Sequence, residues 1–256
     1  MRVTAVGCSG SFPGPASSAS CYLVQTEVAG RTWSVALDLG NGALGPLQCH
    51  LDPRILDAVI LSHLHPDHCL DLCGLHVLYS YTPPPRRAGR LPVHAPPGAA
   101  QRLARAYGVN APEPMDDWFA FTDLSDATPF QVGPFTITPY RVNHPVEAYG
   151  LRVEADSAVL AYTGDTDICD NLSPLCTGAD LMLADCAFVD GRDDIRDIHL
   201  SGSRAAQAAV NAGGVRRLML THMPSWNDPQ VCRAQAATVW PGEVELCRVG
   251  MTYPLP

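Results

Sequence analysis

Apolar residues in this chain recur in short runs separated by glycine, proline, asparagine and aspartate, and this pattern predicts many β-strands. The runs are rich in valine, isoleucine, tyrosine and threonine, which favour extended backbone. The predicted strands are residues 2–6, 21–25, 33–38, 58–61, 92–94, 135–142, 149–154, 158–162, 181–184, 217–220 and 244–248.

Three segments carry helical signals instead. Residues 99–106 combine alanine with arginine, residues 201–211 are followed by two glycines, and residues 229–238 begin with proline. Strands and helices do not alternate regularly, which argues against a barrel or a doubly wound sheet. The pattern predicts a layered α/β (α+β) fold. Because no repeat or long linker interrupts the chain, we expect a single domain over residues 1–256.

Composition narrows the classes of function. The formal charge is −9, and all 17 basic residues are arginine because the chain contains no lysine. This balance argues against a protein that coats nucleic acid or anionic membrane, which needs broad positive potential. No apolar run approaches the roughly 20 residues of a membrane span, and the first residues form a strand pattern rather than a signal peptide. We therefore expect a cytoplasmic protein whose ten scattered cysteines are mostly reduced.

The chemistry concentrates in one segment that follows the predicted strand 58–61. Three histidines and one aspartate lie there within six residues: His63, His65, Asp67 and His68. Imidazole and carboxylate groups suit zinc and similar divalent ions. His63 and His65 alternate along an extended segment and so point to one side, and the turn after Pro66 directs the other two towards a second point. This spacing fits a site for two metal ions.

Three more ligand-type residues follow other apolar strands, where a rigid scaffold can hold functional groups. They are His144, Asp165 and His222. Together with the first segment they complete two predicted metal sites. One consists of His63, His65 and His144, the other of Asp67, His68 and His222, and Asp165 bridges them. The ligand set favours zinc and also suits manganese or iron. The remaining histidines, His50, His76 and His94, have no partner at ligand spacing and are expected to be structural.

The segment His63-Leu64-His65-Pro66-Asp67-His68, followed by His144, Asp165 and His222, resembles the metallo-β-lactamase-fold hydrolases. More narrowly, the chain is similar to the branch that contains ribonuclease Z and the mycobacterial atypical class II cyclic-nucleotide (cAMP) phosphodiesterases. The similarity to those phosphodiesterases extends along nearly the whole chain, including Gly7-Cys8-Ser9-Gly10-Ser11, Gly164-Asp165-Thr166 and His199-Leu200-Ser201-Gly202. It implies a four-layer αββα sandwich with the site along one edge.

The resemblance also implies a mechanism. Two divalent ions would hold a hydroxide that attacks a phosphodiester, and Asp67 would both bind one ion and orient this nucleophile. His199 would donate the proton to the leaving group. Asp185 stands where that branch usually has glutamate, and a carboxylate there would hold His199 protonated. Aspartate is one methylene shorter, so a direct pair between these two residues is open.

Contacts to the substrate are less specific in the sequence. The turn Ser9-Gly10-Ser11 has amides that could face a phosphate, and the alternative is an ordinary hairpin turn. Tyr22, Tyr140 or Trp226 could stack on a base, although aromatic residues more often belong to the core.

The leading functional hypothesis is a metal-dependent phosphodiesterase for small substrates, with 3′,5′-cyclic nucleotides such as cAMP first. Ribonuclease Z usually carries arginine and asparagine after its first strand, and residues 13–19 here contain neither. Its long basic arm for tRNA has no counterpart in this chain, and the charge of −9 also disfavours nucleic acid as a partner. The alternatives are a ribonuclease Z-like tRNA 3′ endonuclease, another ester, lactone or sulfate hydrolase, and a non-catalytic scaffold. A homodimer through the apolar residues 70–81 is a further expectation.

Overall fold

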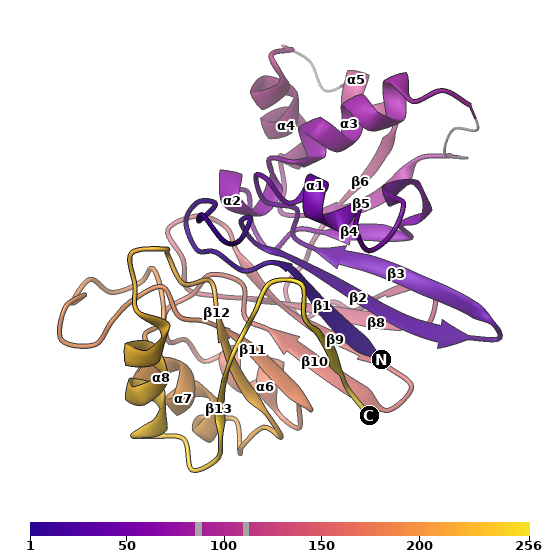
Figure 1. Cartoon of the computed structure of the whole chain (residues 1–256). Coiled ribbons are helices and arrows are strands. Elements are labelled where there is room, and N and C mark those ends of the chain that lie inside the picture. Colours follow the sequence, from indigo (N-terminus) through magenta and orange to yellow (C-terminus); the bar gives the residue numbers. More distant parts are fainter. Residues whose placement is uncertain (85–88, 110–112) are drawn as a thin grey trace.

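Two β-sheets form the centre of the protein (Figure 1). The computed structural model describes residues 1–84, 89–109 and 113–256. The first sheet has the strand order β14 (Thr252–Pro254), β1 (Arg2–Gly7), β2 (Cys21–Val28), β3 (Arg31–Leu37), β4 (Ala58–Ile60), β5 (Leu91–Ala95), β6 (Phe119–Asp123). The second has the order β13 (Val244–Leu246), β12 (Leu218–Thr221), β11 (Leu181–Asp185), β10 (Ala158–Tyr162), β9 (Tyr149–Ala155), β8 (Phe135–Arg141), β7 (Phe130–Val132).

The direction of the strands determines where the site can lie. β3 to β6 run parallel in the first sheet, and β10 to β13 run parallel in the second. β8 pairs with β9 and β9 with β10, both antiparallel, so β8 runs in the same direction as β10. The carboxyl ends of β8, β10, β11 and β12 therefore share one edge of the second sheet. Loops at such an edge are where α/β proteins commonly bind ligands.

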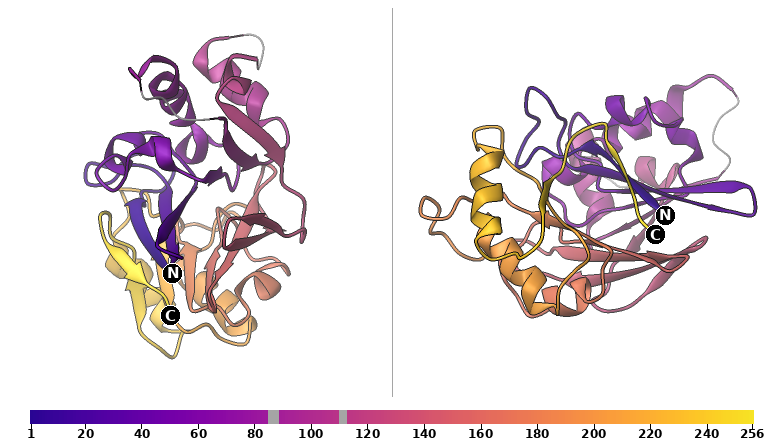
Figure 2. Two further views of the ribbon diagram at one scale, coloured as in Figure 1. Left: turned by 90° about the vertical axis from the view of Figure 1, so that its right-hand side faces the viewer. Right: turned by 60° about the horizontal axis from the view of Figure 1, so that its bottom comes forward.

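Helices cover the outer face of each sheet (Figure 2). Those packed with the first sheet are α1 (Leu44–Leu47), α2 (Pro66–Cys69), α3 (Leu72–Tyr81), α4 (Ala99–Tyr107) and α5 (Glu113–Asp116), together with the short 3₁₀ helix Pro53–Ile55. Those packed with the second sheet are α6 (Leu172–Cys176), α7 (Gly202–Asn211) and α8 (Pro229–Ala237). The order helix, sheet, sheet, helix confirms the predicted four-layer αββα sandwich. None of the helices in the described part of the chain is long and apolar enough to cross a membrane.

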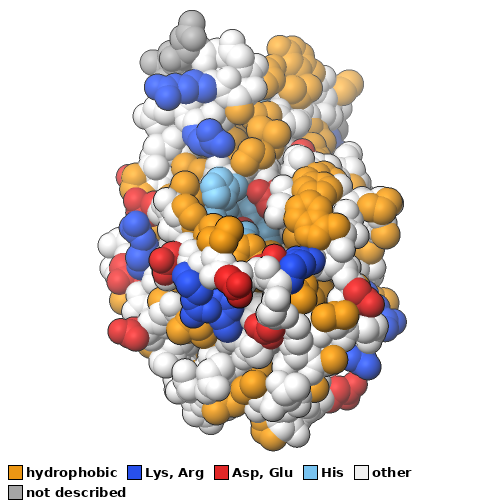
Figure 3. Space-filling model, turned by 90° about the vertical axis from the view of Figure 1, so that its left-hand side faces the viewer, with side chains coloured by type: hydrophobic (Ala, Val, Ile, Leu, Met, Phe, Trp, Pro, Cys, Tyr) orange, Lys and Arg blue, Asp and Glu red, His pale blue; other side chains and the backbone are white. Residues whose placement is uncertain are grey.

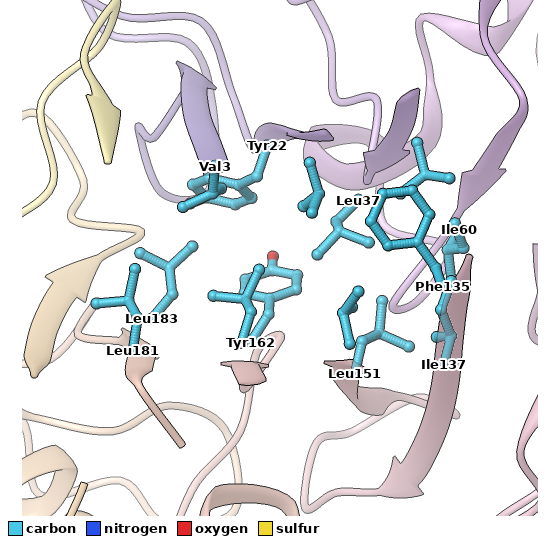
Figure 4. Close-up of a cluster of buried hydrophobic side chains, with 14 of the residues drawn as sticks. Val3, Tyr22, Leu37, Ile60, Phe135, Ile137, Leu151, Tyr162, Leu181 and Leu183 are labelled. Carbon is cyan, nitrogen blue, oxygen red and sulfur yellow. The ribbon is translucent and has the colours of Figure 1, made fainter. Parts of the chain in front are cut away.

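The main core lies between the two sheets, where apolar side chains from both meet (Figure 4). Alternate positions of each strand point into this layer, as the period of two in an extended chain requires. Val3, Tyr22, Leu37 and Ile60 from the first sheet face side chains of the second, including Phe135, Ile137, Leu151, Tyr162, Leu181 and Leu183. A second apolar cluster packs the first sheet against its helices, and a third packs the second sheet against its helices. The strands are therefore buried on both faces.

The predicted strands and helices are all present, and their ends differ from the prediction by at most three residues. β6, β7 and β14, the ten-residue helix α3 and the short helices are not among the strands and helices given above from the sequence pattern. β7 and β14 have three residues each, too few to show an alternating pattern, and all three missed strands lie at sheet edges. The ten cysteines are free thiols, as expected.

The core between the sheets supplies the first prediction. Phe135 is fully buried there, so Phe135→Ala should lower the free energy of unfolding by about 3–5 kcal/mol. Val231 lies exposed on α8, and Val231→Ala should change the free energy of unfolding by less than about 0.5 kcal/mol. Urea unfolding followed by circular dichroism measures both values. Equal effects of the two substitutions would contradict this description of the core.

Candidate metal centre

The seven predicted metal ligands come together on loops at the same edge of the sandwich. His63, His65, Asp67 and His68 follow β4, and the last two belong to α2. His144, Asp165 and His222 follow β8, β10 and β12. On the surface, the histidines lie at the bottom of a hollow that hydrophobic side chains surround (Figure 3). Residues up to 159 positions apart in the chain thus meet because their strands end at one edge.

Tight backbone packing holds α2 in place. The carbonyl groups of Asp67 and His68 accept hydrogen bonds from the amides of Ser20 and Leu39. A Cβ atom on Gly40 would lie only 1.9 Å from the Asp67 carbonyl oxygen, so a larger residue at position 40 would displace α2. The two metal-site residues of this helix are therefore positioned by the loops that follow the first sheet's strands.

Three imidazoles form the first group. His63 Nε2 lies 3.0 Å from His65 Nδ1, and His144 Nε2 lies 3.2 Å from the same atom. Burial lowers the pKa of each of these three histidines, and the pKa of His63 falls well below the usual value for histidine. The neutral form of each ring is therefore favoured. His144 Nδ1 donates to the carbonyl of Ile198 at 2.8 Å, which leaves its Nε2 lone pair facing the group. Three basic nitrogens that converge in this way suit a cation.

The second group combines two carboxylates with two imidazoles, and all four side chains are buried. Asp165 Oδ1 lies 3.2 Å from His68 Nε2, and Asp165 Oδ2 lies 3.1 Å from His222 Nε2. Burial would raise the pKa of Asp67, but the hydrogen bond and charge of His68 lower it to about 2. Burial would also lower the pKa of His68, but Asp165 and Asp38 raise it well above its usual value.

The chemistry of these donors fits metal ions. Among the described residues, His68 Nε2 and Asp165 Oδ1 are buried and make no well-aligned hydrogen bond, although they lie 3.2 Å apart. Buried polar atoms are rarely left in that state, and a bound ion is one way to satisfy them. Each group offers its ligand atoms within 4.8 Å of one another, and Asp165 Oδ2 lies 3.7 Å from His63 Nε2 of the first group. The cluster can therefore hold metal ions, with Asp165 placed between the two groups.

The sequence analysis missed Asp38, which supports the cluster from behind. This buried carboxylate accepts hydrogen bonds from His68 Nδ1 at 2.7 Å and from Tyr162 Oη at 2.7 Å. It also accepts from the amide and the hydroxyl of Ser62, at 2.6 and 2.8 Å. A carboxylate behind a histidine fixes the tautomer and directs the other ring nitrogen towards a metal. Asp38 follows the apolar run 35–37, so the signal that identified Asp165 was also present here.

His222 is held in a strained position by the first loop of the chain. Its φ is +56°, a conformation that non-glycine residues rarely adopt. Ser20 Oγ lies 3.0 Å from its Nδ1, which leaves Nε2 facing Asp165. A Cβ atom on Gly10 would lie 2.1 Å from the His222 carbonyl oxygen, so the close approach of the two loops requires glycine at position 10.

The predicted phosphate contact at Ser9, Gly10 and Ser11 is corrected in part. The amide of Ser9 donates to the carbonyl of Ser18, and the amide of Gly10 donates to the carbonyl of Met223. Neither amide is available to a ligand, because loop packing uses both. The Ser11 amide is the one of the three that faces the cluster, where it donates to His222 Nε2 at 3.4 Å.

His199 and Asp185 form the direct pair that the sequence left open. His199 Nδ1 lies 2.9 Å from Asp185 Oδ2, and Asp185 is fully buried at the end of β11. A bridge between Phe188 and Ser201 draws the His199 loop towards β11, so the shorter aspartate suffices. Burial would lower the pKa of His199, but the charge and hydrogen bond of Asp185 raise it to about 9. The ring lies beside the metal groups, with Nδ1 4.0 Å from Asp165 Oδ2.

The structure shows where the other aromatic and histidine candidates lie. Tyr22 is fully buried and its hydroxyl contacts Thr221, so it cannot stack on a ligand. Tyr140 packs against the core under α6 and α7. Trp226 is exposed and packs on Phe12, with ring centroids 5.1 Å apart. His50, His76 and His94 lie outside the groups that could hold a metal.

Comparisons with known proteins agree with this geometry. The family model described as a beta-lactamase superfamily domain matches residues 35–223. The chain is 41% identical to the uncharacterized protein Rv1339 of Mycobacterium tuberculosis over 247 residues, which cover 95% of this chain and 88% of that protein. It is 30% identical to the probable metallo-hydrolase YhfI of Bacillus subtilis over 264 residues, 99% of each chain. The crystal structure of YhfI superimposes with a TM-score of 0.84 and covers 99% of both chains.

A third relative has a name that describes an activity. Ribonuclease Z of Mycobacterium bovis is 29% identical over 274 residues, which cover 96% of this chain and 95% of that protein.

The carboxylate behind His68 supplies the second prediction. Asp38→Asn removes the negative charge and one acceptor that fix the His68 ring, so zinc affinity should fall about 10–100-fold. Competition with a chromogenic chelator measures this affinity, and circular dichroism verifies that the variant is folded. Asp117→Asn, at an exposed position, is the matched control and should retain the affinity of the wild type. Equal zinc affinities for Asp38→Asn and wild type would show that Asp38 does not support the metal site.

Proposed function

Because the chain belongs to the β-lactamase superfamily and has the metallo-β-lactamase fold of a metal-dependent hydrolase, we propose that it is a phosphodiesterase for small substrates. The proposed substrates are 3′,5′-cyclic nucleotides such as cAMP. His63, His65 and His144 would hold one divalent ion, and Asp67, His68 and His222 the other, with Asp165 between them. Zinc is the proposed metal, and manganese or iron would fit the same donors.

The pair His199–Asp185 carries the proposal. Cleavage of a phosphodiester releases an alkoxide, which is a poor leaving group unless an acid protonates it. His199 is half-buried beside Asp165, and its Nδ1 proton is held by Asp185 at 2.9 Å. This contact orients the ring so that Nε2 is free to donate a proton. A sulfate ester of a phenol or an activated ester has less need of such an acid.

The chain's own residues have separate tasks in this reaction. When bound, the two divalent ions would supply Lewis acidity, activating water near neutral pH and neutralising the phosphoryl charge. Asp67 would bind one ion and orient the attacking water. Asp38 holds the His68 ring through Nδ1, and Ser20 holds the His222 ring in the same way. The Ser11 amide, which lies 3.4 Å from His222 Nε2, would be the backbone donor of its turn that faces a phosphoryl group held at the cluster.

A ribonuclease Z-like activity is the second candidate, because ribonuclease Z of Mycobacterium bovis is a full-length relative. The composition favours a small substrate instead. A protein that grips tRNA draws on many contacts to phosphates, whereas this chain has no lysine and a formal charge of −9.

A substrate panel tests the proposal directly. Metal-loaded protein should hydrolyse 3′,5′-cyclic AMP or GMP faster than 2′,3′-cyclic nucleotides, a precursor tRNA, an acyl-homoserine lactone or an aryl sulfate. Asp67→Ala is the inactive control and should lose at least about 100-fold of the turnover, since it removes a metal ligand. Preferred cleavage of the precursor tRNA would establish the second candidate. Turnover of the lactone or the sulfate alone would refute phosphodiester hydrolysis.

Leaving-group dependence tests the role of His199. His199→Ala should reduce kcat for a cyclic nucleotide by about 10²–10⁴-fold, because the sugar alkoxide needs a proton. The same substitution should reduce kcat for a 4-nitrophenyl phosphodiester far less, since 4-nitrophenolate leaves without one. Steady-state kinetics with both substrates gives the comparison. Similar losses on both would mean that His199 is not the proton donor.

A further inference from the structure

A groove of about 470 Å³ opens beside the first metal group, and His65 itself forms part of its wall. The other residues of the wall come from both halves of the sandwich. Leu64 lies between two metal-site histidines, and Pro96 and Pro97 follow β5. Arg102 belongs to α4, and Val146 and Glu147 follow His144 by two and three residues. We call the hollow that these residues and His65 line the His65 groove. Its volume lies within the range of small-molecule sites.

The His65 groove combines apolar walls with two charged side chains. Leucine, valine and two prolines supply apolar surface on which a flat ring can lie. Arg102 supplies donors, and Glu147 supplies acceptors. Both are held in place: Arg102 Nε donates to the Leu64 carbonyl at 2.8 Å, and Glu147 Oε1 accepts from Tyr149 Oη at 2.7 Å. Glu147 Oε1 also lies 3.2 Å from Arg141 Nη1, and this ion pair helps to hold the carboxylate in place. Among the hydrogen bonds and ion pairs of the described residues, Arg102 contacts only the Leu64 carbonyl, through Nε.

We infer that the His65 groove binds the purine base of the substrate, with Arg102 and Glu147 reading its edge. A purine carries ring nitrogens that accept hydrogen bonds and amino or ring N–H groups that donate them, which complements this pair of side chains. The inference rests on the proposed function, because it assumes that the phosphodiester lies at the metal groups. It assigns Arg102 as a specificity residue.

A larger groove of about 670 Å³ lies on the other side of Arg102, between α2 and α4. None of the seven metal-site side chains lines it. A base bound there would be separated from the cluster by Leu64, Pro97 and Arg102, which contribute to both grooves. Of these two grooves, the His65 groove is therefore the one that a base joined to a cluster-bound phosphodiester can reach. Arg105 lines only the larger groove and provides a matched control on the same helix.

Binding of two ligands to metal-loaded protein tests the inference. One is 3′,5′-cyclic GMP, and the other is the methyl riboside 3′,5′-cyclic phosphate, which has the same phosphodiester but no base. Calorimetry, with every protein carrying His199→Ala to suppress turnover, should show that the wild-type groove binds the nucleotide at least about 10-fold more tightly than the base-free ligand. Arg102→Gln should reduce this preference about 10-fold, whereas Arg105→Gln should retain it.

Val146→Trp provides an independent variant. It fills the His65 groove with an indole and leaves the bond between Arg102 and Leu64 intact, so it should also abolish the preference for the base. A preference that survives Val146→Trp overturns the inference, as does a wild type that binds both ligands equally. Equal binding by wild type together with turnover of both ligands would leave the phosphodiesterase proposal standing. No hydrolysis of either ligand despite a base preference would instead refute the proposed function and support the groove.

Discussion

The Asp38 carboxylate is the interaction on which the rest of the site depends. It follows β3 of the first sheet and accepts hydrogen bonds from Ser62 after β4, from His68 in α2 and from Tyr162 on β10 of the second sheet. One buried group therefore joins both sheets to a metal-site histidine. Each partner donates to it, so its charge is well satisfied although no solvent reaches it. The φ of Asp38 is +59°, which aspartate tolerates better than most residues.

The buried charged groups of the metal-site cluster need one another as partners. Asp67, Asp165 and the histidines around them are buried, and buried charges are costly unless they are paired or bind metals. Two divalent ions would add four positive charges to the formal charge of −9 and leave −5. The protein can thus remain acidic overall while its cleft is locally cationic. Such a cleft suits a small anionic ester better than a long polyanion.

Local patterns in the sequence predicted most strands and three helices, whereas the four-layer order came from the family resemblance. The candidate metal-site residues also leave local signals, and the structure brings them together. The ligands are consecutive in one segment or directly follow apolar strands, and parallel strands bring such positions to one edge. Contacts across the fold leave no such signal. The pairing of His199 with Asp185 depends on a bridge between distant segments, and the loss of the Ser9 and Gly10 amides depends on loops that meet only in the fold. Arg102 lies 37 residues after His65, on a helix that the sequence identified only as a helix.

Seven side chains from both halves of the sandwich are proposed to form two adjoining metal sites. Calorimetric titration of the chelator-treated protein with zinc tests this proposal most directly. Binding should saturate at two ions per chain, with the second site lost in Asp67→Ala. Saturation at one ion, or no binding by a folded protein, would contradict it.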